Sequence, residues 1–222
     1  MRLFFTIILT IFLSSVVWAS AQIPDTMIYN GKKYMFENNP LESYFKKHPN
    51  KFPKSEIWSS GLSKGYIATF EIKDNLLYLK DIKIYVREEK EKSGYFAPEL
   101  KSVLNKVFPR QELVKADWFT GLIVLSYGKV IGFEGFESIY DRYLLFEIDK
   151  GEIIQEKQFD NKEYEEFKEK QFQEFKKTEE YKKMKNDFMK KNPRDKVWYF
   201  DYLTNRNIIQ YSSKILVEDD EK

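Results

Sequence analysis

The chain has 222 residues, of which 42% are hydrophobic and 17% aromatic, enough for one domain with its own core and short for two. The formal net charge is +2 with 32% charged residues, so the whole chain lacks the cationic excess of a nucleic-acid-binding protein. The absence of cysteine excludes disulfides, lipid attachment through a thiol, cysteine zinc sites and thiol catalysis.

The first twenty-one residues carry the pattern of an export signal. Arg2 supplies a positive start, residues 3 to 13 are apolar, and Ala19-Ser20-Ala21 matches an A-x-A cleavage site. We therefore predict a signal peptide over residues 1–21 and an exported protein, periplasmic or secreted. An uncleaved anchor is the alternative, because apolar character continues to Trp18. No later stretch is long enough to span a bilayer, so we expect no stable membrane span after cleavage.

Two hairpins are predicted in the first half of the chain. Asn30-Gly31 and Asp74-Asn75 are two-residue turns between apolar-rich runs, and such residues tolerate the positive φ of a tight hairpin turn. In the strand before the second turn, residues 66, 68, 70 and 72 are apolar and share one face. The apolar phase slips across Lys80-Asp81 in the return strand, which predicts a one-residue β-bulge there.

A short helix is predicted between these hairpins. Asn39 can cap it, Pro40 suits its first position, and residues 41–47 would bury Leu41, Tyr44 and Phe45. Residues 49–64, rich in Pro, Ser and Gly, form a loop that contains Trp58.

Further elements are predicted from residue 87 to residue 159. A charged connection over 87–94 leads to a helix over 99–108, opened by Pro98. A buried strand follows over 120–127, then a tight turn at Gly128-Lys129 and a return strand over 130–136. Residues 142–149 and 152–159 make another hairpin around Lys150-Gly151.

A long charged helical segment is predicted over about residues 160–191, capped by Asp160 or Asn161. Its apolar residues fall into two groups on different sides, so the helix either breaks near Thr178 or packs on different neighbours at its two ends. A last hairpin is predicted from residues 197–203 and 208–217, followed by a frayed acidic tail over 218–222.

Catalytic patterns are weak throughout. The single histidine, His48, has no cysteine to pair with, and the G-x-S-x-G letters at residues 61–65 have a loop before them and a strand after them. A nucleophile elbow needs the opposite arrangement. The sequence leaves enzymatic activity open but favours a protein without it, with no cofactor and no metal site.

Aromatic and acidic side chains are the candidate binding residues. Tryptophans in loops or at strand ends can stack on sugars or on a partner protein, and nearby carboxylates can hydrogen-bond to sugar hydroxyls or perform glycoside hydrolysis. The candidates chosen on this ground are Trp58, Asp117, Trp118, Glu134, Glu137 and Asp141. The run from Trp198 to Tyr202 is a further aromatic cluster.

Four blocks carry a resemblance to known sequences. They begin at Asn39-Pro40-Leu41, Gly65-Tyr66-Ile67, Leu77-Tyr78-Leu79 and Asp117-Trp118-Phe119, and they resemble segments of uncharacterised exported proteins of Gram-negative bacteria. The resemblance covers about residues 23–159 and implies export, but no activity.

Together these observations predict a single α+β domain over residues 22–217. Its expected architecture is an antiparallel, meander-like sheet of several hairpins with two short helices and one long charged C-terminal helix. The expected function is an exported, non-enzymatic binding or protein-interaction module, whose partner is an envelope protein or a glycan and not a nucleic acid. The alternative is a carbohydrate-binding or carbohydrate-active envelope protein.

Overall fold

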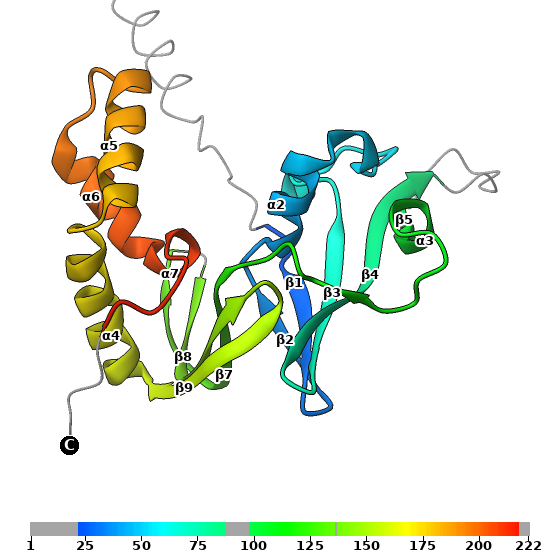
Figure 1. Ribbon diagram of the computed structural model, residues 1–222, viewed down its shortest axis with the longest axis horizontal. Coiled ribbons are helices and arrows are strands. Elements are labelled where there is room, and N and C mark those ends of the chain that lie inside the picture. Colours follow the sequence, from blue (N-terminus) through cyan, green and yellow to red (C-terminus); the bar gives the residue numbers. More distant parts are fainter. Residues whose placement is uncertain (1–21, 88–97, 136, 218–222) are drawn as a thin grey trace, which may run out of the picture.

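The computed structural model describes residues 22–87, 98–135 and 137–217 (Figure 1). The predicted signal peptide, most of the charged connection and the acidic tail lie outside these ranges. Within them, nine strands and six α-helices form an α+β fold, which confirms the predicted class.

The strands lie in the first part of the chain, together with the short helices α2 and α3, and the helices α4–α7 follow the last strand. The strands are β1 (Asp25–Tyr29), β2 (Lys32–Phe36), β3 (Ile67–Lys73), β4 (Leu76–Arg87), β5 (Pro98–Ser102), β6 (Val114–Lys115), β7 (Gly121–Glu134), β8 (Glu137–Asp149) and β9 (Glu152–Asp160). The helices are α2 (Pro40–Lys47), α3 (Leu104–Val107), α4 (Asn161–Phe175), α5 (Glu179–Lys191), α6 (Val197–Arg206) and α7 (Ile208–Tyr211), with 3₁₀ turns at Pro49–Lys51 and Ser60–Leu62.

The sheet is mixed, with the strand order β2-β1-β3-β4-β9-β8-β7 and with β5 and β6 paired to β4. After the β1–β2 hairpin the chain passes through α2 and returns, so that β3 runs parallel to β1. The prediction of an antiparallel meander is wrong at this pair, because the intervening helix allows the crossover that a parallel pair requires. The other pairs recorded among the described strands are antiparallel.

The sheet has two parts, and the strand pairing recorded between them lies at hairpin ends. Between β4 and β9 there is one ladder pair, Leu76 with Glu152, flanked by bonds from Leu77 N to Gly151 O at 2.8 Å and from Ile153 N to Asn75 O at 2.9 Å. The strands β1–β4 then face β7–β9 across a common core, since the ring of Tyr29 on β1 lies 5.0 Å from the ring of Phe146 on β8.

Local turn chemistry is confirmed at three hairpins. The φ angles are positive at both central residues of each turn: 49° and 73° at Asn30-Gly31, 52° and 58° at Asp74-Asn75, and 46° and 76° at Lys150-Gly151. The predicted bulge is also present, because Thr69 pairs with Asp81 and Phe70 with Leu79, which leaves Lys80 as the extra residue.

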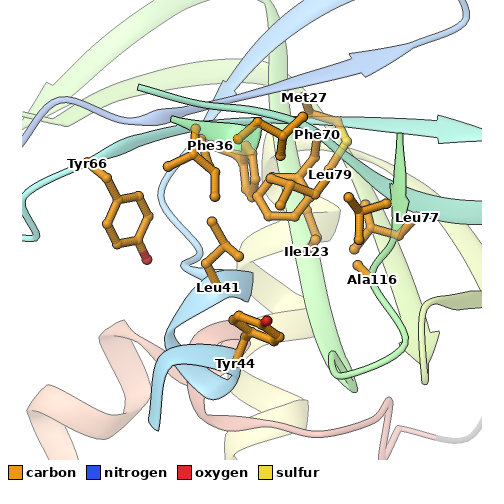
Figure 2. Packing of buried hydrophobic residues seen from close by; sticks show 14 of the residues in the cluster. Met27, Phe36, Leu41, Tyr44, Tyr66, Phe70, Leu77, Leu79, Ala116 and Ile123 are labelled. Carbon is orange, nitrogen blue, oxygen red and sulfur yellow. The ribbon is translucent and has the colours of Figure 1, made fainter. Parts of the chain in front are cut away.

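The first core lies between the two parts of the sheet and beneath α2 (Figure 2). The predicted alternation in β3 is confirmed, since Tyr66, Ala68, Phe70 and Ile72 are all buried. Helix α2 buries Leu41, Tyr44 and Phe45 as predicted, and Figure 2 shows Leu41 pointing from α2 toward the strands. Asn39, however, makes no side-chain cap on α2.

The second core lies on the opposite face of β7–β9, where helices α4–α7 cover it (Figure 1). Leu122, Tyr143 and Leu145 point into this core, while Ile123 and Phe146 point into the first. Because both faces of β7 and β8 are covered, their central residues form the continuous apolar run seen in the sequence.

Helix α4 begins with a full capping box, in which Asp160 accepts from Glu163 N at 2.9 Å and Glu163 accepts from Asp160 N at 2.8 Å. The prediction of a single long helix over 160–191 is wrong, and the alternative prediction of a break near Thr178 is confirmed. The Thr178 hydroxyl accepts from Tyr181 N at 3.2 Å and so caps α5. The break lets α4 pack on the strands while α5 packs on α6.

Three further predictions are wrong. Residues 98–102 form strand β5 on β4, so only the four residues of α3 remain of the helix predicted over 99–108. Gly128-Lys129 is a bulge within β7, which continues to Glu134 before the chain turns. The segment predicted as a last hairpin forms α6 and α7, because Phe200 and Ile208 pack into the second core from helices.

Candidate interaction surface

Two of the predicted binding residues lie in one turn and differ in their surroundings. Trp118 is partly buried, donates from Nε1 to Pro40 O at 3.0 Å, and stacks on Phe108 at 5.5 Å between ring centroids. It therefore anchors α2 to the turn that precedes β7. Asp117 beside it is exposed.

Asp141 has a structural contact. Its Oδ1 accepts from Lys129 N at 2.7 Å, at the bulge in β7. A Cβ on Gly128 would lie 2.0 Å from the same oxygen, so the glycine provides the space for this carboxylate. We conclude that Asp141 holds the bulge.

Trp58 lies in a loop, and its side chain is 81% exposed. The loop is attached to the end of β4 through Glu56, whose N donates to Tyr85 O at 2.9 Å and whose Oε2 accepts from Arg87 N at 3.0 Å. The structure thus separates the two tryptophans, Trp58 on a β4-attached loop and Trp118 against α2.

Glu134 and Glu137 are paired across the β7–β8 hairpin, and both lie near Arg206 at the end of α6. Arg206 Nη2 is 3.2 Å from Glu137 Oε1, and the hydrogen bond and charge of Glu137 raise the pKa of the guanidinium. Glu37, which follows β2, joins the cluster. Burial and then the charge of Glu137 raise the pKa of the Glu37 carboxyl, against the opposing effect of Arg206.

Helix α6 presents an aromatic face that continues this ionic cluster. Phe200 and Thr204 form its buried side, and the Phe200 ring lies 5.2 Å from that of Phe188 on α5. On the opposite side, Trp198 is 64% exposed and Tyr202 is 52% exposed. Trp198, Tyr202 and Arg206 follow one another at intervals of four residues and therefore share one side of the helix.

We call this the α6 surface: Trp198, Tyr199, Tyr202 and Arg206, together with Glu137. The sequence identified Glu137 and the aromatic run but treated the run as a strand, in which alternate residues would face opposite sides. The helical spacing of Trp198, Tyr202 and Arg206 was the signal available for the correct grouping.

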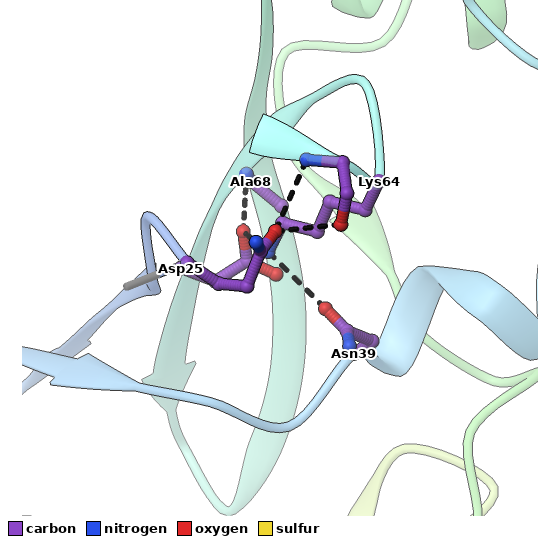
Figure 3. Close-up of polar contacts among 6 residues, drawn as sticks. Asp25, Asn39, Lys64 and Ala68 are labelled. Carbon is purple, nitrogen blue, oxygen red and sulfur yellow. Dashed lines mark hydrogen bonds and ion pairs between the residues drawn. The ribbon is translucent and has the colours of Figure 1, made fainter. Parts of the chain in front are cut away.

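A buried ion pair lies where β1 and β3 begin (Figure 3). Asp25 is fully buried, and its Oδ1 accepts from Lys64 Nζ at 2.6 Å and from Ala68 N at 2.7 Å. Lys64 Nζ also donates to Asn39 Oδ1 at 3.1 Å. Asp25 Oδ2 is buried without a hydrogen-bond partner among the described residues. The pair fixes the start of β1 against β3 and the beginning of α2.

Burial raises the pKa of the Asp25 carboxyl from 3.8, against the opposing charge and hydrogen bond of Lys64. Stability from this carboxyl is therefore fully present below pH 3.8 and is lost as the pH rises toward the raised pKa. Because Asn cannot titrate, we expect the destabilisation caused by Asp25→Asn to be largest in acid and to shrink with rising pH. Urea denaturation of both proteins between about pH 3 and pH 7 measures this difference. A penalty that grows with pH would show that pairing outweighs burial.

An open pocket of about 400 Å³ lies beside the turns of the β1–β2 and β3–β4 hairpins. Its lining includes Tyr29, Asn30, Glu71, Asp74 and Asn75, none of which was a predicted binding residue. Glu71 is already paired with Lys80 Nζ at 2.9 Å.

Over the described ranges, no helix combines the length and the apolar character needed to cross a bilayer. In the same part of the chain, His, Asp and Glu side chains nowhere form a group of three or more suited to a metal ion. No family model matches the chain, and neither a curated protein nor a solved structure is significantly similar to it. The resemblance to exported proteins of Gram-negative bacteria stays a prediction.

Proposed function

We propose that this chain is an exported, non-enzymatic binding protein and that the α6 surface contacts its partner. The observation that carries the proposal is the exposure of Trp198 and Tyr202 on one side of a helix whose other side is fixed in a core. Large exposed aromatics on a rigid helix lose little conformational entropy on binding, and Trp, Tyr and Arg are the residues enriched at binding hot spots.

The ionic end of the surface supports the same function. Arg206 is held by Glu137 and hydrogen-bonds with Tyr202, so the aromatic and ionic groups are oriented together. A partner that covers Tyr202 would also remove water from this ion pair, which strengthens its contribution to specificity.

Photo-cross-linking tests this proposal while the identity of the partner is still open. We would replace Trp198 or Tyr202 by p-benzoylphenylalanine in the full chain and irradiate the cells that produce it. We expect covalent adducts at both positions and none at Met35, a control position on β2 that is 72% exposed. Once a partner is identified, Trp198→Ala and Tyr202→Ala should each weaken binding about 30-fold, the effect of losing a hot spot. Adducts at Met35 but not on α6 would refute the assignment.

A glycan-binding role is the second candidate, and the exposure of Trp58 favours it. An exposed tryptophan beside Glu56 offers a stacking surface and a carboxylate, although Glu56 Oε2 is already bonded to Arg87 N. Retention on immobilised bacterial glycans that is lost in Trp58→Ala, and kept in Trp198→Ala, would select this function over the first.

A further inference from the structure

The connection between α5 and α6 lies at the end of the helical layer remote from the strands (Figure 1). We define the α5–α6 tip as residues 188–199. It contains four exposed cations, Lys190, Lys191, Arg194 and Lys196, against the single acid Asp195, which gives a net charge of +3 (4 − 1). The tip is therefore locally cationic in a chain whose formal net charge is only +2.

Helix chemistry explains only part of this charge. Lys190 and Lys191 lie in the last turn of α5, where cations stabilise the negative end of the helix dipole. Arg194 and Lys196 lie beyond the end of α5, so the dipole of α5 does not account for their presence. None of the ion pairs recorded among the described residues involves any of the four cations.

Three exposed apolar or aromatic side chains follow directly after these cations. Val197 is 44% exposed, Trp198 64% and Tyr199 38%, and the rings of Trp198 and Tyr199 are 5.9 Å apart. Phe200, the next residue, is buried against α5 and fixes the group in place. Trp198 and Tyr199 therefore project from a firmly packed helical hairpin.

We propose that the α5–α6 tip binds the surface of a membrane that contains anionic lipids. Trp and Tyr prefer the level of the lipid head groups, and Lys and Arg are attracted to anionic head groups within a Debye length. Burial of Val197 among acyl chains contributes favourable free energy to binding, whereas its aliphatic side chain cannot stack on nucleic-acid bases. This inference rests on the proposed function, because Trp198 belongs both to the α6 surface and to the α5–α6 tip. It identifies the partner of the tip as lipid.

The cysteine-free chain allows a local test. A single Val197→Cys substitution carries an environment-sensitive nitrobenzoxadiazole label without background labelling. We expect its emission to rise on mixing with vesicles of phosphatidylglycerol and phosphatidylcholine, to stay unchanged with pure phosphatidylcholine, and to fall again in high salt. A label at Trp58→Cys, exposed on another part of the molecule, should not respond to either vesicle.

Charge and aromatic variants then test the mechanism. In the labelled chain, neutralising Lys190, Lys191, Arg194 and Lys196 with Gln should weaken partitioning roughly five-fold for each cation, and roughly a hundred-fold or more together. Replacing Lys32 and Lys33, exposed on β2, should leave partitioning unchanged. Trp198→Ala should reduce both the partitioning and the emission change.

The outcomes separate this inference from the function on which it rests. Absence of any emission change with anionic vesicles, or equal changes at positions 197 and 58, overturns the lipid inference. If photo-cross-linking at Trp198 still captures a protein or a nucleic acid, the α6 surface remains the binding surface and only its partner class changes. If both experiments are negative, both proposals are wrong.

Discussion

Removal of the Lys64 charge should destabilise the protein by about 3–5 kcal/mol at neutral pH, because it leaves a buried carboxylate without its partner. Lys64→Met is the variant of choice, since it keeps most of the aliphatic stem. Asp25 Oδ1 would retain only the bond from Ala68 N, at 2.7 Å, and Oδ2 already has no partner in the described part of the chain. Chemical denaturation measures the change in the free energy of unfolding.

Two controls separate charge pairing from other effects. The double variant Asp25→Asn, Lys64→Met removes both charges and should recover most of the lost stability. Lys46→Met breaks an ion pair with Glu42 in which both side chains are more than half exposed, and should cost less than about 0.5 kcal/mol. A double variant as unstable as Lys64→Met would contradict the view that the unpaired charge is the cause.

Gly151→Ala should have a comparably large effect, about 3 kcal/mol or more, at the junction of the two parts of the sheet. Gly151 has φ of 76°, and a Cβ there would lie 2.8 Å from the backbone oxygen of Ala116. An alanine in left-handed backbone costs about 1–2 kcal/mol, and the contact with a hydrogen-bonded backbone turn adds to it. The same turn carries Asp117 and Trp118.

Gly31→Ala is the matched control. Gly31 also occupies the second position of a two-residue hairpin turn, with φ of 73°, but nothing lies within 4 Å of an added Cβ. Its cost should therefore be the conformational term alone, about 1 kcal/mol. Equal losses of stability in the two variants would show that the close approach of the Ala116 turn is unimportant.

The features that could be predicted from the sequence depend on contacts between near neighbours. The hairpin turns at residues 30–31, 74–75 and 150–151 follow from residue types that accept positive φ, and the capping box follows from Asp160 and Glu163. The bulge at Lys80 follows from the shift in apolar phase. Each signal is contained within a few residues of the element that it specifies.

The elements that could not be predicted are decided by distant contacts. Leu100 fits a helical apolar stripe with Val103 and Val107, yet residues 98–102 pair with β4 and leave Leu100 40% exposed. The run from Trp198 to Tyr202 has strand propensity, but the fit of Phe200 between Tyr181 and Phe188 makes it a helix. The grouping of Glu37, Glu137 and Arg206 combines three segments far apart in the chain, so spacing alone could not reveal it.

The two-sided burial of β7 has a consequence for strand alignment. A one-residue slip of β7 against β8 would still place apolar side chains on both faces, because residues 122–125 are all apolar. Hydrophobic patterning therefore does not by itself penalise the slipped arrangement. A polar contact between the two strands specifies the alignment instead: the Asp141 carboxylate on β8 fits over Gly128 and accepts from Lys129 N of β7 at 2.7 Å. Substitution at Gly128 would thus favour misaligned pairing and exposed strand edges, the route by which such sheets aggregate.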